Sequence, residues 1–129
     1  MVIGDWGFNK VFPGRDPRLA QAEGRVWDAL QRMEDESHSG LVVVYVECLR
    51  LRYSVRYRAW RCWDGFAILE DRELGNYWVR RVREWADGEV GWSLITVVSN
   101  GVPIDEIIAR VRSIARRRTR RLMRMGWGP

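Results

Sequence analysis

Apolar residues follow the three- and four-residue spacing of an amphipathic helix in three parts of the chain. The first part begins at Asp16-Pro17, where aspartate is a good N-cap and proline suits the first turn. The second part, Glu73 to Asp87, ends at Gly88, a residue type that often terminates helices. The third part begins at Pro103. The pattern therefore predicts helices over residues 17–33, 73–87 and 103–125.

The pattern changes to that of β-strands after the first helix. The segment Leu41 to Leu49, LVVVYVECL, is a continuous and mostly β-branched run, which predicts a central strand covered on both faces. Residues 50–60 alternate instead, so one face of a second strand should join the core and the other should be basic. The core face should carry Leu51, Tyr53, Val55, Tyr57 and Ala59, and the basic face Arg50, Arg52, Ser54, Arg56, Arg58 and Trp60.

Two further strands complete the expected sheet. Asp64-Gly65 has the composition of a type I′ turn, so the chain should reverse there and continue as a third strand from Phe66 to Leu69. Val90 to Ser99 predicts a fourth strand with both faces covered. Neighbouring strands with helices before and after them are typical of α+β domains. We expect an α+β fold: a four-stranded antiparallel sheet, helices packed mainly on one face, and a long C-terminal helix.

The C-terminal helix is expected to project from the domain. A helix of about 22 residues is about 33 Å long, which exceeds the width of a small sheet. Its apolar stripe is interrupted after Ala115 and resumes at Leu122. A second subunit would cover such a helix well. The sequence therefore predicts a homo-oligomer, a dimer joined through this helix.

The composition is that of a single globular domain over residues 1–129. Hydrophobic residues make up 47% of the chain and aromatic residues 12%, which is above the range of disordered proteins. Residues 1–14 are rich in glycine and aromatic residues and should form an irregular arm. There is no apolar run of membrane-spanning length and no secretory leader pattern, so we expect no membrane association and a cytoplasmic location.

Positive charge is concentrated in two segments. The formal net charge is +5, yet Arg50 to Arg61 carries five positive residues and Arg110 to Arg124 carries eight, with no acidic residue in either. The remainder of the chain is net acidic. All basic residues except Lys10 are arginines, whose planar guanidinium binds phosphate through two hydrogen bonds and stacks on rings. The segregation favours a polyanionic partner.

The stretch RLRYSVRYRAWRCW, residues 50–63, combines both contacts that hold an unpaired nucleic-acid strand. Cations follow the phosphates, and aromatic rings stack on the bases. Eight tryptophans in 129 residues add to this signal, because Trp60 and Trp63 have no assigned place in the core. A solvated strand whose arginines deter edge pairing would show the same alternation.

Support for catalysis is weak. His38, the only histidine, lies in a polar loop, and the chain lacks nucleotide-binding and zinc-hydrolase motifs. Cys48 and Cys62 lack metal-site spacing and should be buried thiols too far apart to bridge. We expect no metal and no cofactor. A histidine-independent ribonuclease using Glu47, Arg56 and Tyr57 stays open as an alternative, as does a module that assembles with another protein through exposed aromatics.

The chain resembles the ThermoDBP-type single-stranded DNA-binding proteins of archaea. The resemblance is carried by size, by the abundance of tryptophan and arginine, by the expected four-stranded sheet with flanking helices, and by the C-terminal helix. It implies an aromatic cleft rimmed by arginines, DNA binding with little sequence preference, self-association and a thermophilic archaeal host. It transfers no individual site residue, so the expected site follows from the strand argument.

We therefore predict a non-enzymatic protein that binds single-stranded nucleic acid, with DNA favoured over RNA. Arginines should contact phosphates, and aromatic rings should stack on bases. The expected phosphate contacts are Arg50, Arg52, Arg56 and Arg58 together with Arg116, Arg117 and Arg120 of the last helix, and the expected stacking residues are Trp60, Trp63 and, if it turns outward, Tyr57.

Overall fold

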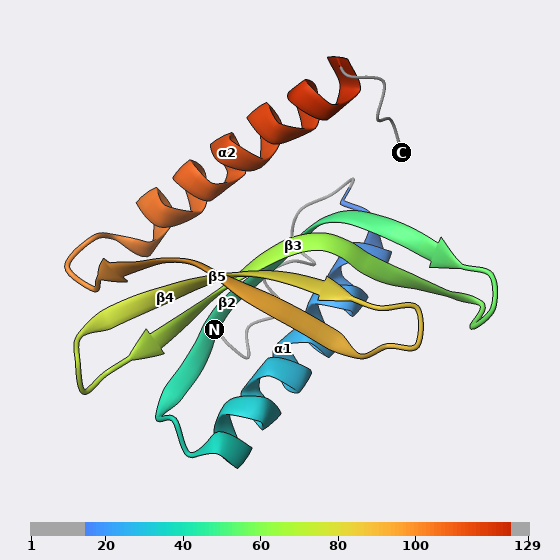
Figure 1. Ribbon diagram of the computed structural model, residues 1–129. Coiled ribbons are helices and arrows are strands. Elements are labelled where there is room, and N and C mark those ends of the chain that lie inside the picture. The colour runs from blue at the N-terminus through green and yellow to red at the C-terminus, as the bar shows by residue number, and fades with distance from the viewer. Residues whose placement is uncertain (1–14, 125–129) are drawn as a thin grey trace. The chain divides into compact units, whose positions relative to one another are not determined.

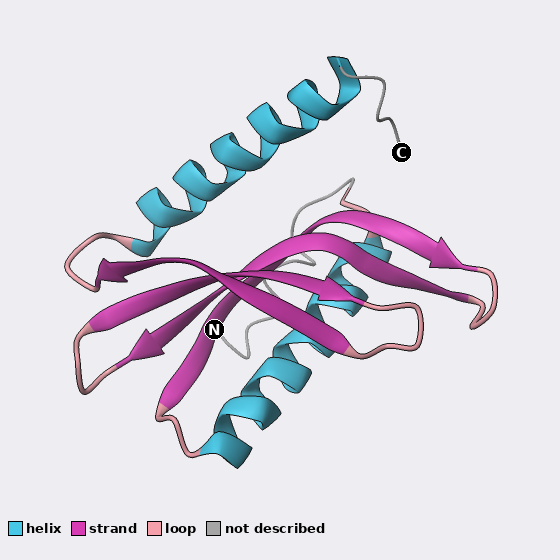
Figure 2. Ribbon diagram, in the orientation of Figure 1, coloured by secondary structure: helices cyan, strands magenta, loops and turns pink. Residues whose placement is uncertain are grey.

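The computed structural model describes residues 15–124, and within the last helix it describes side chains at positions 104–115 and 117. The chain divides into two compact units, residues 1–99 and 100–129, and each is described on its own. The second unit contains helix α2 (Ile104–Arg124), which has Asp105 and Glu106 in its first turn. The first unit contains helix α1 (Pro17–Ser37) and strands β2 (Leu41–Ser54), β3 (Ala59–Asp71), β4 (Asn76–Glu84) and β5 (Val90–Ser99) (Figures 1 and 2).

The four strands form one antiparallel sheet in the order β2-β3-β4-β5, so each strand pairs with its neighbour in the sequence. The prediction of an α+β fold with a four-stranded antiparallel sheet is confirmed. The central position expected for residues 41–49 is wrong, because β2 and β5 are the two edges of the described sheet. Residues 41–49 are nevertheless mostly apolar, because α1 covers one face of this strand and the residues on the other face are half-buried.

Helix α1 packs along one face of the sheet (Figure 1), which we call the α1 face. Asp16 caps the helix by accepting a hydrogen bond from the backbone N–H of Arg18 at 2.9 Å. Burial of each large apolar side chain contributes about 1.5–3 kcal/mol to folding. The core on this face consists of Ala22, Val26 and Leu30 of the helix with Leu41, Val43, Val46, Cys48, Cys62, Ala67, Leu69 and Val82 of the sheet.

The first hairpin lies elsewhere than the sequence suggests. Strand β2 runs without interruption to Ser54, whose hydroxyl accepts a hydrogen bond from the N–H of Tyr57, and the chain reverses in residues 55–58. The expected break near residue 50 and the turn at Asp64-Gly65 are therefore wrong. Gly65 lies inside β3. A Cβ at this position would come 2.6 Å from the carbonyl oxygen of Glu47, so a larger residue would clash. Close approach of two strands, and not a turn, requires this glycine.

The helix predicted over residues 73–87 is also wrong, because most of this segment is strand β4. Its apolar residues fit helical spacing by chance, but Tyr77, Trp78 and Val79 prefer strands, and pairing with both β3 and β5 decides the outcome. The turns that bound β4 contain Gly75 and Gly88, both with positive φ angles, 69° and 91°. Asp87-Gly88 is thus a hairpin signal that resembles a helix stop.

Three glutamates are buried between α1 and the sheet, each with an arginine partner. Because the desolvation of a buried carboxylate is costly, such groups are retained only where charge and hydrogen bonds compensate. Burial raises the pKa of Glu23, although its guanidinium partner opposes the shift. The three pairs are Glu23 with Arg15, Glu34 with Arg80 and Glu84 with Arg25.

Two of these carboxylates also bind the main chain of the sheet. Glu23 accepts a hydrogen bond from the N–H of Cys48 at 2.8 Å, and Glu84 accepts one from the N–H of Cys62 at 2.9 Å. Both amides lie beside shifts in the pairing of β2 with β3. The carboxylates therefore satisfy donors at an irregular part of the sheet.

The two cysteines are close together, so the prediction that they are too far apart is wrong. Both thiols are buried and free, and they share a hydrogen bond. The Sγ of Cys62 and the Cα of Cys48 approach the same point above Gly65, at 3.1 and 3.2 Å from its ideal Cβ position. The missing side chain of Gly65 leaves room for the Cys62 thiol beside the backbone of Cys48.

Candidate nucleic-acid interface

Trp63 lies on the face of the sheet opposite α1, which we call the distal face. Directly paired residues of an antiparallel sheet share a face, and neighbours along a strand point to opposite faces. Leu51 pairs with Cys62 on the α1 face, so Arg52, Arg61 and Trp63 belong to the distal face. The same alternation places Arg83, the neighbour of core residue Val82, on the distal face.

Two guanidinium groups contact the ring of Trp63 from the strands on its two sides. The guanidinium carbon of Arg52, from β2, lies 4.4 Å from the ring centre, and that of Arg83, from β4, lies 4.2 Å from it. The Nε of Arg83 also donates a hydrogen bond to the Trp63 carbonyl oxygen at 2.9 Å. Cation–π contact holds both arginines at the sheet surface, and the hydrogen bond further fixes Arg83.

Trp85, in the turn after β4, extends this arrangement. Its ring meets that of Trp63 edge to face, with centres 6.1 Å apart, and lies 5.5 Å from the guanidinium carbon of Arg83. Its indole nitrogen covers Gly91, where a Cβ would lie only 3.1 Å away. Trp85 is 46% exposed. We call Arg52, Arg61, Trp63, Arg83 and Trp85 the Trp63 cluster.

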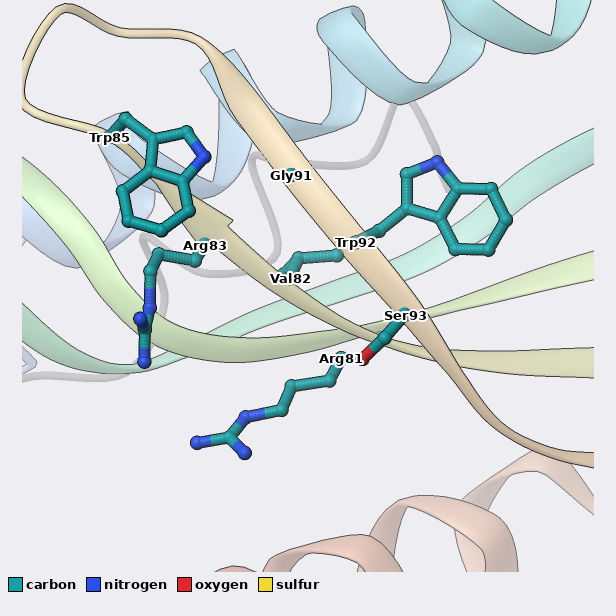
Figure 3. A pocket seen from close by; sticks show the side chains of 7 residues that line it. All are labelled: Arg81, Val82, Arg83, Trp85, Gly91, Trp92 and Ser93. Atoms are coloured by element: carbon teal, nitrogen blue, oxygen red, sulfur yellow. The ribbon is translucent and has the colours of Figure 1, made fainter.

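Two hollows adjoin the Trp63 cluster. One has a volume of about 330 Å³ and is lined by Arg81, Arg83, Trp85, Gly91 and Ser93 among others. Figure 3 shows Arg83 close to Trp85 and the side chains of Arg81 and Ser93 extending to the same side of β5. The other hollow has a volume of about 280 Å³, and its lining includes Arg52, Arg61, Trp63 and Trp85. The tryptophan rings thus border open space.

The electrostatics of this surface favour an anion. Arg81 is paired with Asp64 at 3.2 Å, and Arg61 lies 3.9 Å from Glu84, a buried carboxylate that Arg25 also binds. The Nε groups of Arg50 and Arg61 are buried without a hydrogen-bond partner among the described residues. Arg52 and Arg83 contact aromatic rings and have no carboxylate partner among the described residues. Positive charge is therefore in excess over carboxylate at this site.

The structure separates the site residues expected from sequence. Arg52 and Trp63 are together on the distal face, and Arg50 pairs in register with Asp64 beside them. Trp60 is on the α1 face, where Arg18 of α1 covers its ring at 4.2 Å and Tyr53 meets it edge to face. The predicted run of arginines ending at Trp60 on one face is therefore wrong. The hairpin at residues 55–58 reverses the chain, so alternation counted from Arg50 does not continue to Trp60.

The other expected residues lie away from the Trp63 cluster. Arg56, Tyr57 and Arg58 occupy the exposed turn between β2 and β3, and the guanidinium of Arg56 lies 5.3 Å from the Tyr57 ring. Val55, expected in the core, is 80% exposed in the same turn. Arg117 is exposed on α2, and Arg116 and Arg120 lie outside the described side chains.

Sequence reasoning missed Arg61, Arg83 and Trp85. Both Arg83 and Trp85 fall within the helix that the sequence predicts over residues 73–87, and that prediction hides their place beside Trp63. The alternation of Trp63 with Arg61, and the Asp87-Gly88 turn directly after Trp85, are signals that point to the correct site.

The residues of the alternative ribonuclease site are not assembled. Glu47 is buried in the middle of β2 and accepts a hydrogen bond from Tyr45, whereas Arg56 and Tyr57 lie beyond the end of that strand. At about 3.3 Å per residue, Glu47 is about 26 Å along the strand from the turn. These three groups cannot act on one phosphate. The described residues also contain no cluster of three or more metal-binding side chains.

Comparisons with protein-family models, with curated proteins and with solved structures found no match to this chain. Neither helix, over its described residues, has the length and apolar character needed to cross a membrane.

Proposed function

We propose that the protein binds single-stranded nucleic acid on the distal face, at the Trp63 cluster. The observation that carries the proposal is the contact of Trp63 with Arg52 and Arg83 beside the exposed ring of Trp85. Guanidinium groups held next to rings are suited to contact phosphates while bases stack alongside. The proposed partner is intracellular, and a cytoplasmic location is part of the proposal.

Within this site we assign the stacking role to Trp85. The ring of Trp63 is half-buried and already contacts two guanidinium groups, so it serves to position the arginines. Trp85 is more exposed and borders both hollows. Stacking on an aromatic ring tolerates every base, which fits binding with little sequence preference. DNA is favoured over RNA, as the resemblance to the ThermoDBP-type proteins implies, and no enzymatic step is proposed.

The test is a titration of labelled oligo-dT with the protein and with two tryptophan variants. Trp85→Ala should weaken binding by about 1–3 kcal/mol, which is roughly five- to 150-fold in affinity. Trp60→Ala is the matched control, because it removes a comparably exposed ring from the α1 face. Circular dichroism checks that both variants fold.

The two tryptophan variants also decide between the two faces. Equal loss of affinity in both variants, or loss only in Trp60→Ala, would contradict binding at the Trp63 cluster. Absence of oligo-dT binding at low salt would show that the proposed binding function is wrong. A parallel titration with oligo-rU measures the preference for DNA.

A further inference from the structure

Strand β5 is an unprotected edge of the sheet. It pairs with β4 and with no other strand that the structure describes. Its ten residues, VGWSLITVVS, include no charge and no proline. The exposed fractions of Trp92, Leu94, Ile95 and Val97 lie between 43% and 47%, so the prediction that both faces of this strand are covered is wrong. Such an edge offers unpaired backbone groups beside apolar side chains and favours pairing with another strand.

The other edge of the described sheet differs from β5. Strand β2 carries the charged residues Glu47, Arg50 and Arg52, and its pairing with β3 shifts at three places. Helix α1 also packs against it. Charges, bulges and covering helices are the usual protections of an edge strand. Strand β5 has one register shift, opposite Val79 and Arg80, and carries no charged residue.

We propose that β5 pairs antiparallel with β5 of a second copy of the chain. A two-fold axis at Ile95, in the middle of the strand, places Ile95 of one copy opposite Ile95 of the other, and the uncharged strand pairs without like-charge repulsion. In this register Glu89, before β5, lies opposite Gly101 of the other copy, so the flanking carboxylates stay apart. Each copy then covers apolar side chains of the other.

This pairing joins two binding surfaces, a consequence that rests on the function proposed above. The two-fold axis of an antiparallel pair is perpendicular to the sheet, so both distal faces lie on the same side. Each Trp63 is on β3, and the two β3 strands are five strand spacings apart, which is about 24 Å. Arg81 and Ser93 lie on this face between each cluster and the edge (Figure 3). One nucleic-acid strand would then contact both clusters.

The first test is the mass of the protein in solution, measured by light scattering at high micromolar concentration. The wild-type chain should have twice its monomer mass of 15.2 kDa. Ile95→Lys and Ile95→Glu should each be monomeric, because like charges meet near the two-fold axis, and a mixture of the two should restore the dimer. Leu74→Lys, an equally drastic change at an exposed apolar residue in the β3–β4 turn, is the control and should stay dimeric.

Several outcomes would overturn the pairing. A monomeric wild-type chain, or a dimer that survives both Ile95 variants and Val97→Lys, contradicts it. A dimer lost only when residues 116–129 are deleted places the interface in α2, as the sequence predicts. Val97→Lys is a second edge variant that gives a result if either Ile95 variant fails to fold.

The second test uses oligo-dT of about 6 and about 24 nucleotides, which suit one and two clusters. Ile95→Lys should bind the long strand at least about tenfold more weakly than the wild type and bind the short strand equally well. Equal affinity for the long strand contradicts the joined surface. If the wild type binds neither strand, the proposed function is wrong, and the mass measurement still decides the β5 pairing.

Discussion

The guanidinium carbon of Arg80 lies 3.6 Å from the centre of the Trp92 ring, while the same group donates a hydrogen bond to Glu34 of α1 at 2.9 Å. One side chain thus connects the helix, the strand β4 and the edge strand β5. Glu34 and Arg80 are both buried. The contact makes the position of β5 depend on a charge pair inside the protein.

Arg80→Gln should lower the free energy of unfolding by about 3–5 kcal/mol, because it leaves the Glu34 carboxylate buried without its partner. The double variant Glu34→Gln/Arg80→Gln should recover much of this loss, since no charge is then left uncompensated. Urea denaturation of the wild type and of the single and double variants measures both effects. If the double variant is as unstable as Arg80→Gln, packing and not charge explains the loss.

The stability of the protein should fall in acid through Glu34. Burial opposes ionisation of this carboxyl, but hydrogen bonds from Arg80 and Ser39 hold its pKa below the ordinary value. The unfolded chain therefore binds more protons, and stability is lost as the pH falls from the ordinary glutamate pKa through the folded pKa. Glu34→Gln should show a weaker decline than the wild type over this range in acid-dependent urea denaturation.

Glu23 is a control for that measurement, because its pKa is shifted in the opposite direction from that of Glu34. Burial raises its pKa, so the folded state binds its proton more readily and this group contributes a loss of stability as the pH rises above the ordinary value. Glu23→Gln should therefore steepen the acid decline relative to the wild type. Parallel curves for both variants and the wild type would contradict these assignments.

The two thiols should be inert in the native protein. A shared hydrogen bond and burial raise the pKa of Cys62, which removes the reactive thiolate at neutral pH. A chromogenic disulfide reagent should titrate both cysteines rapidly in urea and only slowly without it. The chain has no other cysteine, so the whole absorbance change comes from these two thiols. Fast reaction in native buffer would show that the site opens.

Phosphate contact by Arg52 and Arg83 should be visible in the salt dependence of binding. Each lost phosphate contact lowers the slope of log affinity against log salt by about 0.7 for a single strand. Arg52→Ala and Arg83→Ala should each show this change, whereas Arg72→Ala, an exposed arginine in the β3–β4 turn, should not. Unchanged slopes in the first two variants would mean that these arginines only support Trp63.

The amino-acid sequence by itself determined the helix after Asp16-Pro17, the strand from Val90 to Ser99, the fold class and the concentration of arginine and tryptophan near Trp63. These features depend on local chemistry: a cap, a run of β-branched residues and side-chain type. Periodicity alone could not assign residues 73–87, since their spacing fits a helix and only pairing on both sides makes them a strand.

Tertiary structure decided which rings and guanidinium groups meet. Trp60 and Trp63 are three residues apart in β3 and so lie on opposite faces, but only the hairpin at 55–58 decides that Trp63, and not Trp60, shares a face with Arg52. Arg83 reaches Trp63 across a strand pair that the sequence does not reveal. The same pairing brings Cys48 and Cys62 together over Gly65. Contacts between strands depend on register, and a single bulge changes the register without a distinct signal in the sequence.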